Sequence, residues 1–259
     1  DKDGDEIYEY NPFIGHFMNT ITYALIGLLL FIILYQLFPP DKNKAWYFSF
    51  PFIATLLFVL HPLHTEAVAN IKGRDELLSL LFSLAVLYFS VRYSKNKRPV
   101  ELVWAALFFM AAILSKEAAV TFLAVVPMTL FYFTNDSWKK IFITTAPLLL
   151  ILVIYLPIRM EILGGARTKP IPELMNMPFM HSGDTGRMPT VFYTLGLYLK
   201  LLFFPHPLTH DYYPWHPIGE YMAGTGQKYP YLTWANGRAL IPFLIYMWLF
   251  IYAIRDFFR

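Results

Sequence analysis

The sequence lacks cysteine and has few charged residues. None of its 259 residues is a cysteine, and 15% are charged, whereas a typical soluble domain carries roughly 25% charge. The missing cysteine excludes disulfides, thiolate metal sites and cysteine nucleophiles. The low charge, together with 57% hydrophobic residues, argues against a soluble globular enzyme, a disordered chain and a coiled coil.

Several common functional motifs are also missing. The sequence contains no Walker A loop, no Gly-x-Gly-x-x-Gly turn, no nucleophile elbow and no His-Glu-x-x-His helix. It therefore gives no indication of nucleotide binding or of hydrolysis by a serine nucleophile. In a membrane protein, a small positive net charge such as this +3 usually comes from basic residues in the loops. We therefore expect no nucleic-acid partner. The chain opens on an acidic stretch without Met, and we expect it to be a fragment of a longer chain.

Long hydrophobic runs dominate what is present. A helix needs about 20 apolar residues to cross a bilayer, and Trp and Tyr suit the ends of such a helix. The sequence predicts an all-α, polytopic membrane protein with seven spans, at about 13–38, 46–62, 76–93, 100–115, 118–134, 141–157 and 239–255. Residues 158–238 then form a loop region on one face of the membrane.

Basic residues predict the orientation of these spans. Short loops containing Lys42, Lys95 and Lys139 share one side, which the positive-inside rule makes cytoplasmic. Region 158–238 is then extracytoplasmic, and we expect segment 189–204 to be a surface or re-entrant helix there. The alternative is that 189–204 spans the membrane, which would reverse the last helix.

Three polar blocks fall on the predicted extracytoplasmic face. The first contains His61, His64, Glu66 and Arg74 at the end of a span. Ionisable groups at membrane depth are costly and usually functional, although a polar turn that anchors two spans would have the same sequence pattern.

The second block is Ser115-Lys116-Glu117, at the tip of an apolar hairpin. Lys116 there either faces a lipid phosphate or snorkels to the interface.

The third block lies in the long loop region. It contains His206, His210, Asp211, Tyr212 and Tyr213. Two His and one Asp could ligate a metal, but proline and paired tyrosines equally suit a rigid aromatic wall for a sugar. We assign no metal ligand, and we do not favour a divalent metal as a cofactor.

Four sequence blocks resemble one known family. The blocks NPFIGHFMNTITYAL, HPLHTEAVANIKGRDELLSLLF, ILSKEAAVTF and YLKLLFFPHPLTHDYYP are similar to the motifs of the transmembrane and tetratricopeptide-repeat O-mannosyltransferases and their bacterial relatives. The resemblance implies a GT-C-like helical bundle with extracytoplasmic surface helices and loops. The family's acidic catalytic motif should precede Asn11, and residues 1–10 do not clearly match it.

The resemblance also implies an activity. Such an enzyme moves a mannose-like sugar from a polyprenyl-phosphate carrier to a protein hydroxyl on the extracytoplasmic face. Arg74 and Lys116 would bind the carrier phosphate, and Glu66, His64 and Asp211 would act as catalytic groups. The substrate-binding candidates are His61, Glu117, His206, His210, Tyr212 and Tyr213. We expect the blocks at 60–66 and 205–213 to pack together around the sugar.

The implied partners are membrane lipid, the lipid-linked sugar, an acceptor protein, and a downstream tetratricopeptide-repeat region or membrane subunits. The implied location is the bacterial inner membrane with the active face toward the periplasm, or the endoplasmic reticulum in a eukaryote. Two other classes of function fit the same spans: a non-catalytic membrane scaffold that keeps the fold, and a transporter of the lipid-linked sugar.

The orientation is testable because the parent chain has no cysteine. Single cysteines at Lys42, Lys95 and Lys139 should react with a membrane-impermeant thiol reagent only from the cytoplasmic side. Cysteines at Lys116 and His210 should react only from the opposite side. Labelling of the His210 variant from the cytoplasmic side alone would mean that 189–204 spans the membrane.

Overall fold

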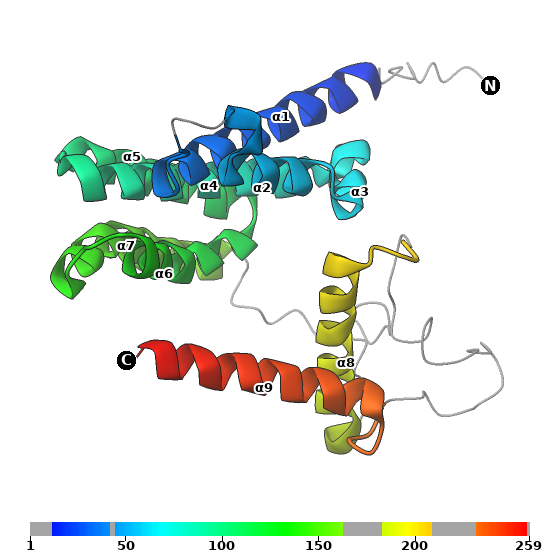
Figure 1. Ribbon diagram of the computed structural model, residues 1–259. Helices are drawn as coiled ribbons and strands as arrows, with labels where there is room; N and C mark the ends of the chain where they lie inside the picture. The colour runs from blue at the N-terminus through cyan, green and yellow to red at the C-terminus, as the bar shows by residue number, and fades with distance from the viewer. Residues whose placement is uncertain (1–11, 42–44, 163–182, 209–231, 258–259) are drawn as a thin grey trace. The chain divides into compact units, whose positions relative to one another are not determined.

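The computed structural model describes residues 12–41, 45–162, 183–208 and 232–257, and all regular secondary structure in these residues is helical (Figure 1). The chain divides into two compact units, residues 1–167 and 168–259. The helical fold class predicted from the hydrophobic runs is therefore confirmed.

The first unit contains seven α-helices and four short 3-10 turns in its described residues. In chain order they are α1 (Pro12–Leu37), η1 (Trp46–Phe48), α2 (Phe50–Val59), η2 (Pro62–His64), α3 (Thr65–Ala69), η3 (Ile71–Gly73), α4 (Arg74–Asn96), α5 (Pro99–Ser115), η4 (Glu117–Thr121), α6 (Phe122–Phe133) and α7 (Trp138–Ile162).

Local sequence signals set several helix ends. Proline opens α1 and α5, where its missing N–H costs no hydrogen bond. The Ser49 hydroxyl caps α2 by accepting a hydrogen bond from Phe52 N at 3.4 Å. The helix α4 ends at Lys97, which adopts the left-handed conformation common at helix C-termini (φ 56°).

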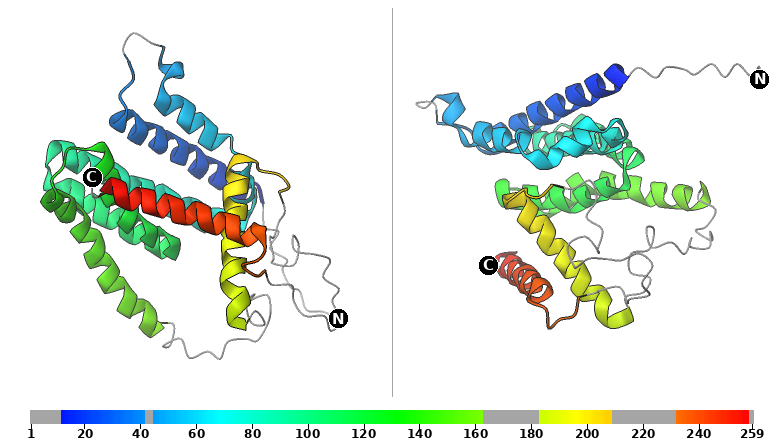
Figure 2. Two further views of the ribbon diagram at one scale, coloured as in Figure 1. Left: turned by 60° about the horizontal axis from the view of Figure 1, so that its bottom comes forward. Right: turned by 90° about the vertical axis from the view of Figure 1, so that its right-hand side faces the viewer.

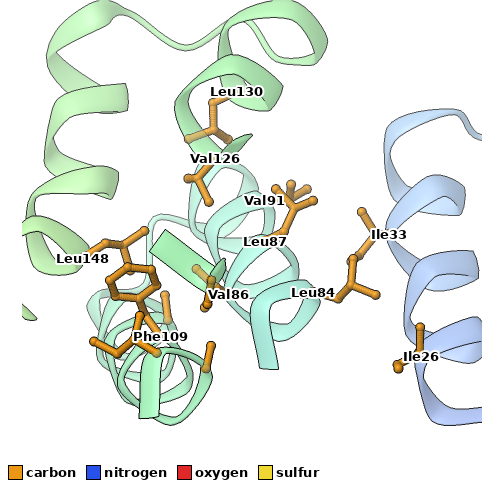
Figure 3. Packing of buried hydrophobic residues seen from close by; sticks show 14 of the residues in the cluster. Ile26, Ile33, Leu84, Val86, Leu87, Val91, Phe109, Val126, Leu130 and Leu148 are labelled. Atoms are coloured by element: carbon orange, nitrogen blue, oxygen red, sulfur yellow. The ribbon is translucent and has the colours of Figure 1, made fainter. Parts of the chain in front are cut away.

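The helix α4 is the centre of the first unit. It packs against α1, α5, α6 and α7, and its Leu84, Val86 and Val91 meet apolar side chains from these helices (Figure 3). Serines such as Ser83 and Ser90 also lie buried on α4, and small residues let neighbouring helices approach closely in membrane bundles. The Ser90 hydroxyl donates to Val86 O at 2.8 Å, which satisfies it inside its own helix.

The helices α1 and α2 lie side by side (Figure 2). A Cβ at Gly27 would lie 2.9 Å from a methyl of Val59, so this glycine permits the close approach. The Tyr23 hydroxyl donates to Val59 O at 3.0 Å and thereby occupies a carbonyl left free at the end of α2.

Polar contacts fasten the C-terminal end of α4. Lys95 Nζ donates to Gln36 O of α1 at 2.6 Å, and Lys140 Nζ of α7 donates to Ser94 O at 2.6 Å. Arg92 Nε lies 3.1 Å from a carboxylate oxygen of Glu101 in α5. The residues that we predict to be cytoplasmic therefore surround one end of α4.

Among the described residues, four helices are long and apolar enough to cross a membrane: α1, α4 with its preceding turn, α7 and α9 (Gly237–Phe257). The pair Phe50–Val59 and Pro62–Ala69 would make a fifth span, bent by 47°. The remaining predicted spans, 100–115 and 118–134, correspond to the shorter apolar helices Pro99–Ser115 and Glu117–Phe133. Seven crossings stay a prediction.

The second unit consists, in its described residues, of α8 (Gly183–Phe203) and α9 (Gly237–Phe257). The two helices cross at Gly196, where an added Cβ would overlap the ring of Pro242. Tyr246 donates from its hydroxyl to Leu195 O at 3.2 Å, on the same contact. The helix α8 includes residues 189–203 of the predicted segment 189–204, and its position on the membrane surface stays a prediction.

Gly196 gives a test of the crossing of α8 and α9. Gly196→Ala should lower the free energy of unfolding by about 1–3 kcal/mol, because the proline ring cannot move aside without shifting α9. Hydrogen exchange of the α8 and α9 amides would measure the loss. Gly237→Ala is the matched control, since its methyl meets only the end of Ile241 at 3.9 Å. Equal exchange in both variants would contradict this packing.

Candidate functional site

The candidate site lies at the N-terminal end of α4. Residues 61–73 lead into this end as two 3-10 turns and one short helix, following a sharp bend after α2. Gly73 permits the tight path, because a Cβ there would lie 2.5 Å from Ala67 O. The Asn70 side chain accepts a hydrogen bond from Lys72 N at 3.0 Å and starts the last turn before Arg74. Arg74 therefore opens α4 from a closely packed turn.

The Arg74 guanidinium is held by neutral oxygen atoms of α1. Its Nε donates to Asn19 Oδ1 at 3.2 Å, and Nη2 donates to Gly15 O at 3.2 Å. No carboxylate among the described residues lies within ion-pair distance of Arg74. The side chain is thus oriented and half-buried while its positive charge is not neutralised there.

Lys116 reaches the same end of α4 but meets carboxylates. Its ammonium group forms an ion pair with Glu76 and lies 3.7 Å from Asp75 Oδ2. The hydrogen bond with Glu76, and then the charge of Asp75, raise the pKa of Lys116. Lys116 thus contacts the two residues that follow Arg74 in α4, and the shared role of Arg74 and Lys116 in binding a carrier phosphate stays a prediction. Sequence reasoning did not foresee that Lys116 would be engaged by two acidic groups.

Glu117 belongs to a neighbouring ion pair. Arg159 of α7 donates from Nη1 to Glu117 Oε2 at 3.4 Å and to the Tyr155 hydroxyl at 2.7 Å. The backbone N–H of Glu117, followed by Arg159, lowers the pKa of the Glu117 carboxyl. Glu117 is exposed, so its carboxylate contacts solvent as well as Arg159.

The two histidines of the first block have different surroundings. His61 Nδ1 accepts a hydrogen bond from Leu63 N at 3.3 Å and so caps its own turn. The His64 ring packs against Phe58 and Tyr23, with centroid separations of 4.4 and 5.7 Å. Glu66 is exposed in the first turn of α3. Their predicted roles in catalysis and substrate binding stay predictions.

The third polar block is only partly described. His206 is exposed beyond the end of α8. The other predicted residues of this block, His210, Asp211, Tyr212 and Tyr213, lie outside the described residues. The contact that we expect between 60–66 and 205–213 therefore stays a prediction.

No group of three metal-ligating side chains occurs within the described part of the chain. A metal site normally needs three or four such ligands, so nothing in these residues provides one.

Sequence reasoning missed Asn19 and Arg159 as parts of this region, and it did not identify Asp75 and Glu76 as partners of Lys116. Asn19 carried a usable signal, because an amide inside a long apolar run is costly unless it finds partners. The partners of Lys116 and Arg159 are about 40 residues away in sequence, and no local pattern indicates such pairs.

Comparison with known proteins gives partial matches. No protein-family model and no solved structure matches the chain. The human "Protein O-mannosyl-transferase TMTC3" is 35% identical over 119 residues, which make up 44% of this chain and 12% of the relative. The Caenorhabditis elegans "Protein O-mannosyl-transferase F38B6.6" is 38% identical over 87 residues, or 34% of this chain and 12% of the relative.

A third relative, the human "Protein O-mannosyl-transferase TMTC1", is 41% identical over 81 residues, which are 31% of this chain and 8% of the relative. The matches thus span about a tenth of the length of these relatives. The names of these relatives nevertheless agree with one another, since each is a protein O-mannosyl-transferase. Over the matched segments, the chain is similar to protein O-mannosyl-transferases, the kind of enzyme whose motifs the sequence blocks resemble.

Proposed function

We propose that this chain is part of a membrane glycosyltransferase that transfers a mannose-like sugar from a polyprenyl-phosphate carrier to a protein hydroxyl. The observation that carries the proposal is the Arg74 guanidinium, oriented by Asn19 and Gly15 without a carboxylate partner in the described residues. The names of the relatives support the transferred sugar and the protein acceptor.

The position of Arg74 suits the phosphate of a lipid-linked donor. The helix α4 contains 23 residues and is therefore roughly 34 Å long, close to the ~30 Å thickness of a bilayer core. Arg74 is its first residue and would lie at the membrane interface, where the carrier phosphate sits while the polyprenyl tail remains among the lipids. Arginine can bind phosphate through two parallel hydrogen bonds.

The chemistry needs a stabilised leaving group and a base. The acceptor oxygen would form a bond to the anomeric carbon of the sugar as the bond from that carbon to the phosphate oxygen breaks. The phosphate leaves with the electron pair, and Arg74 and Lys116 would stabilise its charge. The hydroxyl proton would pass to a general base, for which Glu66, His64 and Asp211 are the candidates.

Lys116 would take part differently from Arg74. Because Glu76 and Asp75 already hold its ammonium group, a phosphate must share Lys116 with these carboxylates. We therefore assign the stronger contact with the carrier to Arg74. We place the active face on the extracytoplasmic side, because the basic loops surround the other end of α4.

A transfer assay tests the proposal. Membranes containing the protein would be supplied with mannosyl-phosphoryl-polyprenol and an acceptor protein. Arg74→Ala should reduce transfer about 10- to 100-fold, because a charge-assisted hydrogen bond contributes about 1.5–3 kcal/mol. Lys116→Ala should also reduce transfer, by a smaller factor.

Lys72→Ala is the matched control. Lys72 is an exposed cation two residues before Arg74, and only its backbone N–H is engaged in the turn. Its loss should leave transfer unchanged. Full transfer by Arg74→Ala, or equal losses in the Lys72 and Arg74 variants, would contradict the assignment.

A further inference from the structure

Asn19 is a fully buried amide in the N-terminal third of the apolar helix α1. Its relative exposure is 0%, and all three of its hydrogen bonds go to a segment about 50 residues later in the chain. Nδ2 donates to Val68 O at 3.3 Å and to Asn70 O at 2.9 Å, and Oδ1 accepts from Arg74 Nε at 3.2 Å. An amide at such a place is costly unless it is satisfied, and here it is.

These bonds fix Arg74 from two directions. The amide nitrogen of Asn19 holds the backbone of residues 68–70, which leads into the turn before Arg74. The amide oxygen holds the guanidinium directly, and Gly15 O holds a second nitrogen of the same group. Because two guanidinium nitrogens of Arg74 and the segment before its turn are bonded to α1, the orientation of Arg74 depends on a residue that lies beneath the surface.

The chemistry of the partner is as important as its position. Two other arginines of the first unit, Arg92 and Arg159, are oriented by carboxylates of Glu101 and Glu117. An aspartate at position 19 could accept the same bond from Arg74 Nε, but it would lose the donations to Val68 O and Asn70 O, and its charge would cancel that of the guanidinium. The neutral amide aligns Arg74 and leaves its full positive charge for an anion.

We infer that Asn19 is a positioning residue for the donor phosphate, and that it acts through Arg74 without contacting the phosphate itself. The inference rests on the proposed function, because it assumes that Arg74 binds the carrier phosphate. It assigns to α1 a part in recognition of the donor. The competing explanation is that Asn19 only joins α1 to the following loop, as polar residues often do between membrane helices.

Binding of two lipids separates these explanations. The protein, reconstituted in phosphatidylcholine vesicles, would be titrated with polyprenyl phosphate and with polyprenol, which has the same tail and no phosphate. The wild type should prefer polyprenyl phosphate. Arg74→Ala should abolish the preference, while the affinity for polyprenol stays unchanged.

Two Asn19 variants then test the positioning role. Asn19→Ala removes all three hydrogen bonds. Asn19→Asp keeps the shape and the acceptor for Arg74 Nε, but it loses the donations to Val68 O and Asn70 O and adds a negative charge beside Arg74. Each should weaken binding of polyprenyl phosphate by about tenfold in protein that remains folded by thermal melting. If Asn19→Ala does not fold, the nearly isosteric Asn19→Asp still provides the test.

The double variant Asn19→Ala/Arg74→Ala supplies a readout that a purely structural role would not produce. It should bind polyprenyl phosphate no more weakly than Arg74→Ala alone, because the effect of Asn19 passes through Arg74. Thr22→Val is the control, since Thr22 is also buried in α1 but bonds only to Met18 O of its own helix. It should bind both lipids as the wild type does.

The outcomes that overturn the two proposals differ. Normal binding of polyprenyl phosphate by the folded Asn19 variants, or independent losses in the double variant, would overturn the role of Asn19 alone. A wild-type protein that does not distinguish polyprenyl phosphate from polyprenol would overturn the phosphate site, and with it the proposed function.

Discussion

The hydrogen bonds between Asn19 and the start of α4 are the constraint on which the candidate site depends. They join α1 to a turn that begins about 50 residues later, and they set the direction of Arg74. A buried amide has few alternative partners in an apolar environment, so its bonds are specific as well as stabilising. Without them, the turn at 68–70 would lose its hydrogen bonds to Asn19, and the guanidinium would keep only its bond to Gly15 O of α1.

The central helix α4 separates two polar regions of different character. At its C-terminal end, lysines hold the ends of α1 and α4 through backbone carbonyls, and Arg92 is paired with the buried Glu101. Of these cations, Arg92 and Lys140 are paired with the carboxylates of Glu101 and Asp136, whereas Lys95 bonds a neutral carbonyl. At the N-terminal end, Lys116 is paired but Arg74 is not, within the described residues. This end therefore presents a guanidinium that neutral oxygens orient.

A bend at Pro62 makes the helices before α4 irregular. The chain bends by 47° between α2 and the short helices that begin at Pro62, and His61 and His64 lie at this bend. Irregular backbone at membrane depth requires partners for its polar groups. Tyr23, His61 and Asn70 supply such partners from their side chains, so the same residues that mark the motif also stabilise its turns.

Much of the helical framework was predictable from the sequence. The hydrophobic runs located α1, α4, α7 and α9, because a membrane-length apolar run has few other conformations. The blocks around His61, Glu66, Arg74 and Lys116 were also visible, because charge is rare in this chain. The bend between α2 and the short helices that follow it was not predictable. Pro62 shows that the backbone can bend there, but it does not show which side chains will bond the carbonyls that the bend leaves free.

The sequence by itself determined the helical class, the positions of the long apolar segments and the small set of polar residues available for chemistry. Only the tertiary structure decided which of those residues meet. Lys116 and Arg74 have similar charges in the sequence, but packing gives one of them carboxylate partners and the other an amide. The physical reason is that hydropathy is a property of each segment, whereas the state of a charge depends on groups that folding brings from 40 to 60 residues away.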